Sequence, residues 1–96
     1  MVRFLSLISF TDQGIRDVAK SIDRAEAFRA DVESKGGKVL SQYWGIGSVD
    51  GCVTFECPDD VTAASLLLSL GKNDNVRTSS TRIFTAEEFA AAVKTT

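Results

Sequence analysis

Few side chains in this 96-residue sequence can carry acid–base, nucleophilic or metal chemistry, because histidine is absent altogether. Its absence removes Ser-His-Asp and Cys-His nucleophile pairs, histidine metal ligands and the side chain that usually titrates near neutral pH. Any reaction must therefore use a carboxylate, bound water or a group on the ligand itself.

Asp50 is the candidate catalytic residue, because it opens an expected strand on the polar face of that strand. Burial in a pocket raises the pKa of an aspartate, so that it can act as a general base. The alternative is a turn residue whose carboxylate accepts backbone hydrogen bonds. Glu56 shares the face of Asp50 but lies about 20 Å further along the strand, too far for a carboxylate pair.

Five further residues are candidates for binding a ligand. Tyr43 and Trp44 are neighbours on one expected strand, so their rings point to opposite faces of the sheet. The ring on the uncovered face forms either a pocket wall or an interface anchor, and the alternative is that both rings only pack in the core or an interface. Thr11 and Gln13 follow the first strand, where they form a pocket rim or simply a turn and helix cap. Arg77 either holds an anionic ligand or pairs with a surface carboxylate.

The two cysteines, Cys52 and Cys57, are five residues apart on one expected strand, so their side chains point to opposite faces. They therefore do not form a disulfide with each other or share a metal, and Cys57 is expected to be a small buried hydrophobe. Reduced thiols indicate a cytoplasmic protein. We expect no metal, because the chain has no histidine and no cysteine pair at ligand spacing. We expect no cofactor, since the Gly45-Ile46-Gly47-Ser48 segment joins two strands and opens no helix that could hold a phosphate.

The charge and hydropathy of the chain exclude two kinds of partner. Thirteen acidic and eleven basic residues give a net charge of −2, which argues against a nucleic-acid binder. No apolar stretch approaches the ~20 residues that cross a bilayer, and the apolar start lacks a signal cleavage site. We expect neither nucleic acid nor membrane as a partner.

The hydrophobic periodicity predicts a single domain over residues 1–96 with the order β-α-β-β-α-β and an added C-terminal helix. This order is typical of the ferredoxin-like α+β fold, a four-stranded antiparallel sheet with both helices on one face. Thr85 and Glu88 form a predicted capping box, and Ser21 a predicted cap within the first helix. The expected strands are 2–10, 38–44, 49–57 and 76–84, and the expected helices are 16–35, 58–70 and 85–93.

The first strand is apolar on both faces, with Val2, Phe4, Ile8 and Phe10 on one face and Leu5 and Leu7 on the other. One layer of helices covers one face only, so the other, which we call the open face, needs a second cover. A second copy of the sheet is the economical cover, which predicts a homo-oligomer, a dimer or higher. The alternative is a monomer with an exposed patch.

Five segments spread over nearly the whole chain carry a resemblance to a known family. They are Phe10-Thr11-Asp12-Gln13-Gly14-Ile15-Arg16, Arg24-Ala25-Glu26-Ala27-Phe28, Tyr43-Trp44, Asn75-Val76-Arg77-Thr78 and Phe84-Thr85-Ala86-Glu87-Glu88-Phe89. In these segments the chain resembles the GYD-domain proteins, although the namesake Gly-Tyr-Asp falls on Ser48-Val49-Asp50, where only the aspartate is kept. This resemblance implies an assembly like the dimeric α+β barrels, in which two sheets stack, and it implies no established reaction.

These observations predict a small oligomeric domain that binds a small organic molecule on or between the open faces. Two alternatives stay open. One is a cofactor-independent enzyme of the dimeric α+β-barrel type with Asp50 as its base. The other is a purely structural or regulatory assembly module whose open face is entirely interface.

Overall fold

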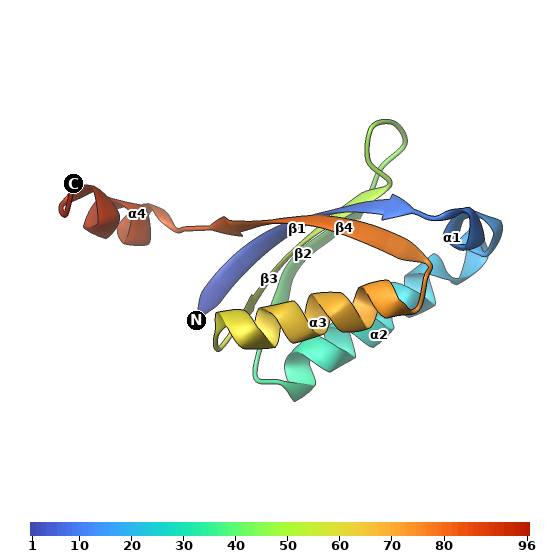
Figure 1. The fold of residues 1–96 in the computed structure, drawn as a ribbon, viewed down its shortest axis with the longest axis horizontal. Coiled ribbons are helices and arrows are strands. Elements are labelled where there is room, and N and C mark those ends of the chain that lie inside the picture. The colour runs from blue at the N-terminus through green and yellow to red at the C-terminus, as the bar shows by residue number, and fades with distance from the viewer.

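The computed structural model describes all residues from Met1 to Thr96 and has the predicted ferredoxin-like order. The four strands form one antiparallel sheet in the order β2-β3-β1-β4, and α2 and α3 lie on one face of it (Figure 1). The strands are β1 (Val2–Phe10), β2 (Lys38–Trp44), β3 (Gly51–Cys57) and β4 (Val76–Ile83); the helices are α1 (Asp12–Arg16), the 3-10 turn η1 (Val18–Lys20), α2 (Ser21–Ser34), α3 (Asp60–Lys72) and α4 (Ala86–Val93).

The core lies between the sheet and the two helices. Phe55 of β3 is fully buried at its centre and makes an edge-to-face contact with Phe28 of α2, with ring centroids 5.5 Å apart. Phe4 of β1 stacks on the Phe55 ring. These contacts remove aromatic side chains of the sheet and of α2 from water, which is the main force that holds helices onto a sheet. The buried cluster comprises Phe28, Val32, Val39, Val53, Phe55, Cys57, Ala63 and Leu66.

The helix predicted over 16–35 is confirmed over Ser21–Ser34, whereas the chain breaks at Asp17 and forms the 3-10 turn η1 before α2 begins. The helical chain begins earlier, where Thr11 caps α1 by accepting the N–H of Gly14. The guanidinium of Arg24 then donates to the Asp17 and Gly14 carbonyls, which satisfies backbone acceptors at the break. The prediction of Ser21 as a cap is wrong, because Ser21 is the first residue of α2 and the N-cap position is Lys20, which makes no side-chain capping hydrogen bond.

The third strand begins at Gly51, two residues later than predicted. Asp50 lies in a bend, where its N–H donates to the Ile8 carbonyl and its own carbonyl accepts the N–H of Gly45. These two hydrogen bonds close the base of the loop between β2 and β3. Asp59 caps α3 through its side chain, so Pro58 precedes the cap and does not occupy the first helical turn.

The strand register assigns the faces of the sheet, because residues paired across antiparallel strands share a face. Phe4 pairs with Phe55 on the helix-covered face, whereas Leu5 pairs with Thr54 and Thr81 on the open face. The predicted division of β1 into two apolar faces is therefore confirmed. The open face consists of Arg3, Leu5, Leu7, Ser9, Lys38, Ser41, Tyr43, Cys52, Thr54, Glu56, Arg77, Ser79, Thr81 and Ile83.

The C-terminal helix α4 lies beyond the end of β4, and neither α2 nor α3 covers it (Figure 1). The capping box is confirmed, since the Thr85 hydroxyl accepts the Glu88 N–H and the Glu88 carboxylate accepts the Thr85 N–H. None of the residues of α4 is buried. The molecule measures 48 × 30 × 18 Å, and α4 accounts for one end of its longest dimension. None of the helices is long and apolar enough to cross a membrane.

Candidate functional site

The six candidate residues all lie near one end of the sheet, where β1 and β2 end and β3 and β4 begin. The register places Phe10 opposite Val76, and Gly51 opposite both Ile8 and Trp44. The loops that carry the candidates therefore meet at this end. Within it they occupy three separate places: a polar cluster, the base of the β2–β3 loop, and the two faces of β2.

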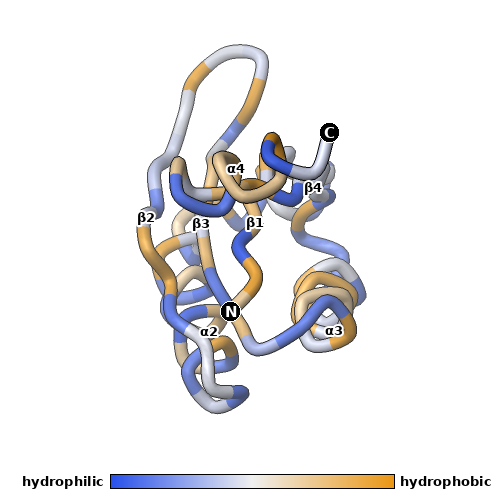
Figure 2. Tube along the Cα trace, turned by 90° about the vertical axis from the view of Figure 1, so that its left-hand side faces the viewer, coloured by the Kyte–Doolittle hydropathy of each residue, from blue (hydrophilic) through white to orange (hydrophobic).

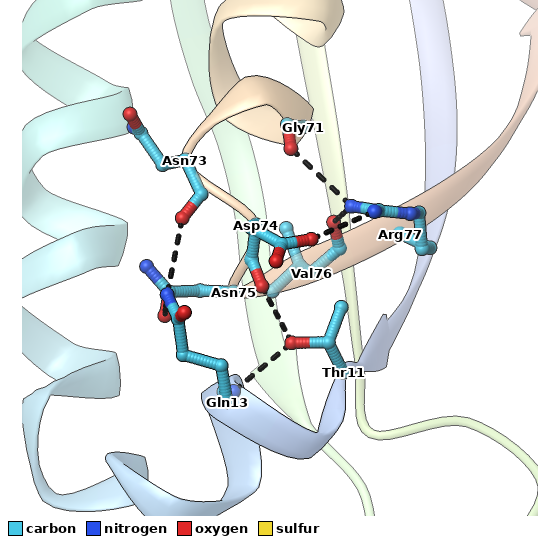
Figure 3. A network of polar contacts seen from close by, with 9 residues as sticks. Thr11, Gln13, Gly71, Asn73, Asp74, Asn75, Val76 and Arg77 are labelled. Atoms are coloured by element: carbon cyan, nitrogen blue, oxygen red, sulfur yellow. Dashed lines mark hydrogen bonds and ion pairs between the residues drawn. The ribbon is translucent and has the colours of Figure 1, made fainter.

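The polar cluster joins the loop after β1 to the turn between α3 and β4 (Figure 3). The Thr11 hydroxyl donates to the Asp74 carbonyl at 2.6 Å, and the Gln13 amide donates to the Asn75 side-chain oxygen at 3.1 Å. Arg77 donates to the Asp74 carboxylate at 2.8 Å and to the Gly71 carbonyl at 3.3 Å. These side chains are therefore engaged mainly with the backbone of neighbouring loops.

Gly14 belongs to this cluster and follows Thr11 and Gln13 in the segment that the sequence predicts to be a pocket rim or a turn. A Cβ atom at this position would overlap the carbonyl oxygen of Asn75. The Asn75 carbonyl also accepts the N–H of Thr11 at 3.1 Å, so the two loops are in direct backbone contact. Glycine is required here because of this close approach. The sequence shows the glycine that follows Thr11-Asp12-Gln13, but it does not show the contact with Asn75, because Asn75 lies far away in the chain.

Asp50 is half-buried, and its Oδ2 accepts the N–H of Phe10 at 2.7 Å. Phe10 is the last residue of β1, and the pairing of β1 with β3 ends at Ile8 and Gly51. The Asp50 carboxylate therefore accepts a backbone N–H of β1 beyond the last residue pair with β3. The arrangement has the geometry of the turn-residue alternative. Glu56 lies at the other end of β3 and pairs with Arg3 at 3.0 Å.

The register places Tyr43 on the open face and Trp44 on the helix-covered face. Trp44 lines a small cavity of about 40 Å³ between the sheet and α2, together with Phe10, Arg24 and Gln42. This space suits a few water molecules and is far smaller than the ~300 Å³ of typical ligand pockets. A wider groove of about 510 Å³ continues from it between α2 and α3, and shares the lining residues Arg24, Phe28, Leu70 and Val76.

The open face is uncharged at its centre. Leu5 and Leu7 of β1 lie between hydroxyl and thiol side chains of the flanking strands, and Ser41 and Thr54 hydrogen-bond to each other at 2.5 Å. The ion pairs at this face stand near its two ends, Arg3 with Glu56 and Arg77 with Asp74. Tyr43 is 65% exposed beside Cys52, and it is the largest side chain that the face presents.

The cysteines occupy opposite faces, as predicted. Cys57 is completely buried, and this burial raises the pKa of its thiol, so the thiol stays protonated and unreactive. Cys52 is partly exposed on the open face. No three of the Cys, Asp and Glu side chains come close enough together to hold a metal ion.

The fold and this arrangement define a ferredoxin-like α+β domain with one face of its sheet uncovered. The profile of the GYD domain matches residues 4–93, and the chain therefore belongs to the GYD-domain family. No protein of curated function matches its sequence.

Several solved structures share the fold. MtbAldR superposes with a TM-score of 0.68 at 12% identity, over 88% of this chain and 52% of that one. A point mutant of Rv3291c superposes with a TM-score of 0.62 at 20% identity, over 90% of this chain and 52% of that one. The leucine response regulatory protein LrpA of Mycobacterium tuberculosis superposes with a TM-score of 0.57 at 20% identity, over 88% of this chain and 51% of that one. This chain spans about half the length of these proteins, and at such identities the likeness shows the fold alone.

Proposed function

We propose that this chain is a homodimeric module of the cytoplasm, in which two open faces stack and a small organic molecule binds between them. The observation that carries the proposal is the uncovered open face, whose central strand presents Leu5 and Leu7 where no helix of the same chain covers them. Contiguous apolar surface on a central strand is characteristic of an interface.

The distribution of charge supports face-to-face stacking. Like charges brought together by a two-fold axis repel each other, and an unpaired charge at the centre of an interface is costly to desolvate. Here the centre of the open face carries leucine, serine, threonine and cysteine, while the ion pairs stand near its ends. Two copies can therefore approach without burying an uncompensated charge at the centre of the interface, and Lys38, the open-face charge without an ion pair, lies at the end of strand β2.

Tyr43 supports the binding of a ligand between the faces. Its ring stands 65% exposed at one end of the open face, and a tyrosine in such a place stacks on planar or apolar groups while its hydroxyl makes a hydrogen bond. The ligand class that fits is a small uncharged or singly charged organic molecule with an apolar portion. Several hydroxyl groups of the face are available to orient its polar portion.

The test compares Leu7→Arg with Leu68→Arg. Leu7 is 40% exposed on the open face, whereas Leu68 is 73% exposed on α3, away from the sheet. Light scattering at micromolar concentration is expected to give twice the 10.4 kDa chain mass for the wild type and for Leu68→Arg, and the single chain mass for Leu7→Arg. A wild-type monomer, or a Leu7→Arg dimer as stable as the wild type, contradicts the stacking.

The same variants test the ligand. A molecule held between two faces binds the dimer and not the monomer, so its stabilisation depends on assembly. In a thermal-shift screen of amino acids and small aromatic and aliphatic acids, a stabilising compound is expected to raise Tm for Leu68→Arg and to have no effect on Leu7→Arg. A shift of equal size in both variants places the site elsewhere, and no shift with any compound favours the alternative of an assembly module without a ligand.

A further inference from the structure

Helix α4 is an amphipathic helix that contains no buried residue and is covered by neither α2 nor α3 (Figure 1). Its apolar side consists of Ala86, Phe89, Ala90 and Val93, which helical spacing places on one face. Phe89 is 61% exposed, Val93 and the preceding Phe84 are each more than half exposed, and the helix contains no buried residue. Phe89 and Val93 of α4 are therefore largely exposed at one end of the molecule, and Phe84 just before the helix is exposed with the Arg82 guanidinium 4.4 Å from its ring centroid.

A helix of this length needs a partner surface. Eight residues form two turns, and isolated helices shorter than about 12 residues are marginal in water because nucleation is costly. The capping box at Thr85 and Glu88 satisfies the first turn but adds only about 1 kcal/mol. Packing of the apolar side is what stabilises most short helices in proteins. Neither the sheet nor α2 and α3 buries a residue of α4, so these elements do not supply that packing surface.

A second unpartnered apolar feature stands at the opposite end of the sheet. The loop between β2 and β3 rises on the side of the sheet away from α2 and α3 in both views (Figure 1, Figure 2), and Ile46 on this loop is fully exposed. The loop is held at its base, where Gly45 donates to the Asp50 carbonyl and the Asp50 carboxylate accepts the N–H of Phe10. Ile46 is thus presented beyond the open face on a fixed support.

We propose that α4 of one protomer packs against the β2–β3 loop of a second copy, with Phe89 and Val93 contacting the partner's Ile46. The inference rests on the proposed dimer and specifies how it is held together. When two open faces stack about a two-fold axis that runs across the strands, each end of one sheet lies over the opposite end of the other. That operation brings α4 of each copy to the end that carries the partner's loop, and it forms the contact twice.

The area of the open face agrees with this assignment. Four strands ~4.8 Å apart and about eight residues long present roughly 500 Å² in projection, and α4 adds roughly 120 Å². A stable interface buries about 800 Å² of accessible surface on each partner. Because the accessible surface of a face with protruding side chains exceeds its projection, the sheet together with α4 offers an area of this order. A second copy is therefore an occupant of the right size.

Disulfide cross-linking between two differently sized chains tests the contact directly. Both chains carry Cys52→Ser, and Cys57 is completely buried, so neither native thiol reacts. One chain carries Ile46→Cys and a mass tag, and the other carries Phe89→Cys without a tag. After mixing and oxidation with diamide, the crossed product is expected to dominate on a non-reducing gel. Val61→Cys on the exposed side of α3 replaces Phe89→Cys as the control and is expected to give no crossed product.

The other arrangements give different products. Pairing of α4 with α4 yields the homodimer of Phe89→Cys chains, and it overturns the proposal. Folding of α4 back onto its own sheet yields no product between chains and also overturns it. When light scattering still shows a dimer in either case, stacking of the open faces stands and only the role of α4 fails. A wild-type monomer removes both proposals.

Substitutions on the two sides of α4 provide a second measurement. Phe89→Glu places a charge on the apolar side, whereas Ala91→Glu places the same charge on the opposite side of the helix. The dimer Kd is expected to rise at least about tenfold for Phe89→Glu and to change less than about twofold for Ala91→Glu. Equal effects of the two variants contradict the contact. Because α4 contributes no buried residue to the domain, the circular dichroism of the sheet and of α2 and α3 is expected to be unchanged.

Discussion

At the scale of single residues, most of the polar side chains selected for chemistry make hydrogen bonds to the backbone. Thr11 and Gln13 bind the turn after α3, and Asp50 binds the end of β1. A residue that completes backbone hydrogen bonding contributes to stability whatever else it does, because an unpaired buried N–H or carbonyl is costly. Measurements of stability therefore have to accompany every test of function at this end of the sheet.

Asp50→Ala is expected to lower the free energy of unfolding by about 1–2 kcal/mol, because it leaves the Phe10 N–H without its acceptor. Asp50→Asn keeps a side-chain oxygen and is expected to cost less than the alanine variant. Urea denaturation measures both. Equal stability of wild type and Asp50→Ala contradicts the structural role, and a catalytic role fails if Asp50→Asn leaves ligand affinity and turnover unchanged.

Gly14→Ala is expected to destabilise the fold by about 1–3 kcal/mol, because the added methyl group overlaps the Asn75 carbonyl and pushes two loops apart. Gly71→Ala is the matched control. Its added Cβ has no neighbour within 4 Å, and it lies inside α3. Alanine there is expected to stabilise the helix by about 0.5–1 kcal/mol. Thermal denaturation of the two variants is expected to shift Tm in opposite directions, and a shared direction contradicts the close approach of the two loops.

At the scale of elements, the helix ends follow local rules where the partners are near in sequence. The capping box of α4 involves residues three apart, and the cap of α3 joins Asp59 to Thr62. The break between α1 and α2 has a different origin. The contacts of Thr11 and Gly14 with Asn75 place α1 beside the turn that leads into β4, and the chain turns at Asp17 before α2 begins.

The cap of α3 predicts a pH dependence. The N–H of Thr62 donates to the Asp59 carboxylate and lowers the pKa of Asp59 below its ordinary value. A lowered pKa in the folded state stabilises the fold fully above the ordinary pKa, and this stabilisation is lost as pH falls through the lowered pKa.

Asp59→Asn keeps an acceptor but has no charge to lose. The difference in the free energy of unfolding between wild type and Asp59→Asn is expected to be constant near neutral pH and to shrink between about pH 5 and about pH 2. Urea denaturation across this range measures it. If the free energies of unfolding of the two proteins change with pH in parallel, the charge of Asp59 does not stabilise α3.

At the scale of the whole molecule, two surfaces remain uncovered, namely the open face and the apolar side of α4. Both are more easily explained by a second copy than by solvent, because together they approach the area of a stable interface. The response of the dimer to Leu7→Arg belongs to this scale, since it tests the face as a whole. An enzyme of the dimeric α+β-barrel type requires an enclosed space between the faces with Asp50 at its edge, whereas a pure assembly module has side chains filling that space.

The sequence alone was sufficient for the order of the elements, the two faces of β1, the opposite orientation of the cysteines and the capping box of α4. Each of these depends on periodicity or on residues a few positions apart, which the order of side chains encodes directly. Only the tertiary structure decided that Tyr43 and not Trp44 lies on the open face, that Asp50 holds the end of β1, and that Gly14 meets Asn75. These facts depend on strand register and on contacts between segments far apart in the chain, which local patterns do not specify.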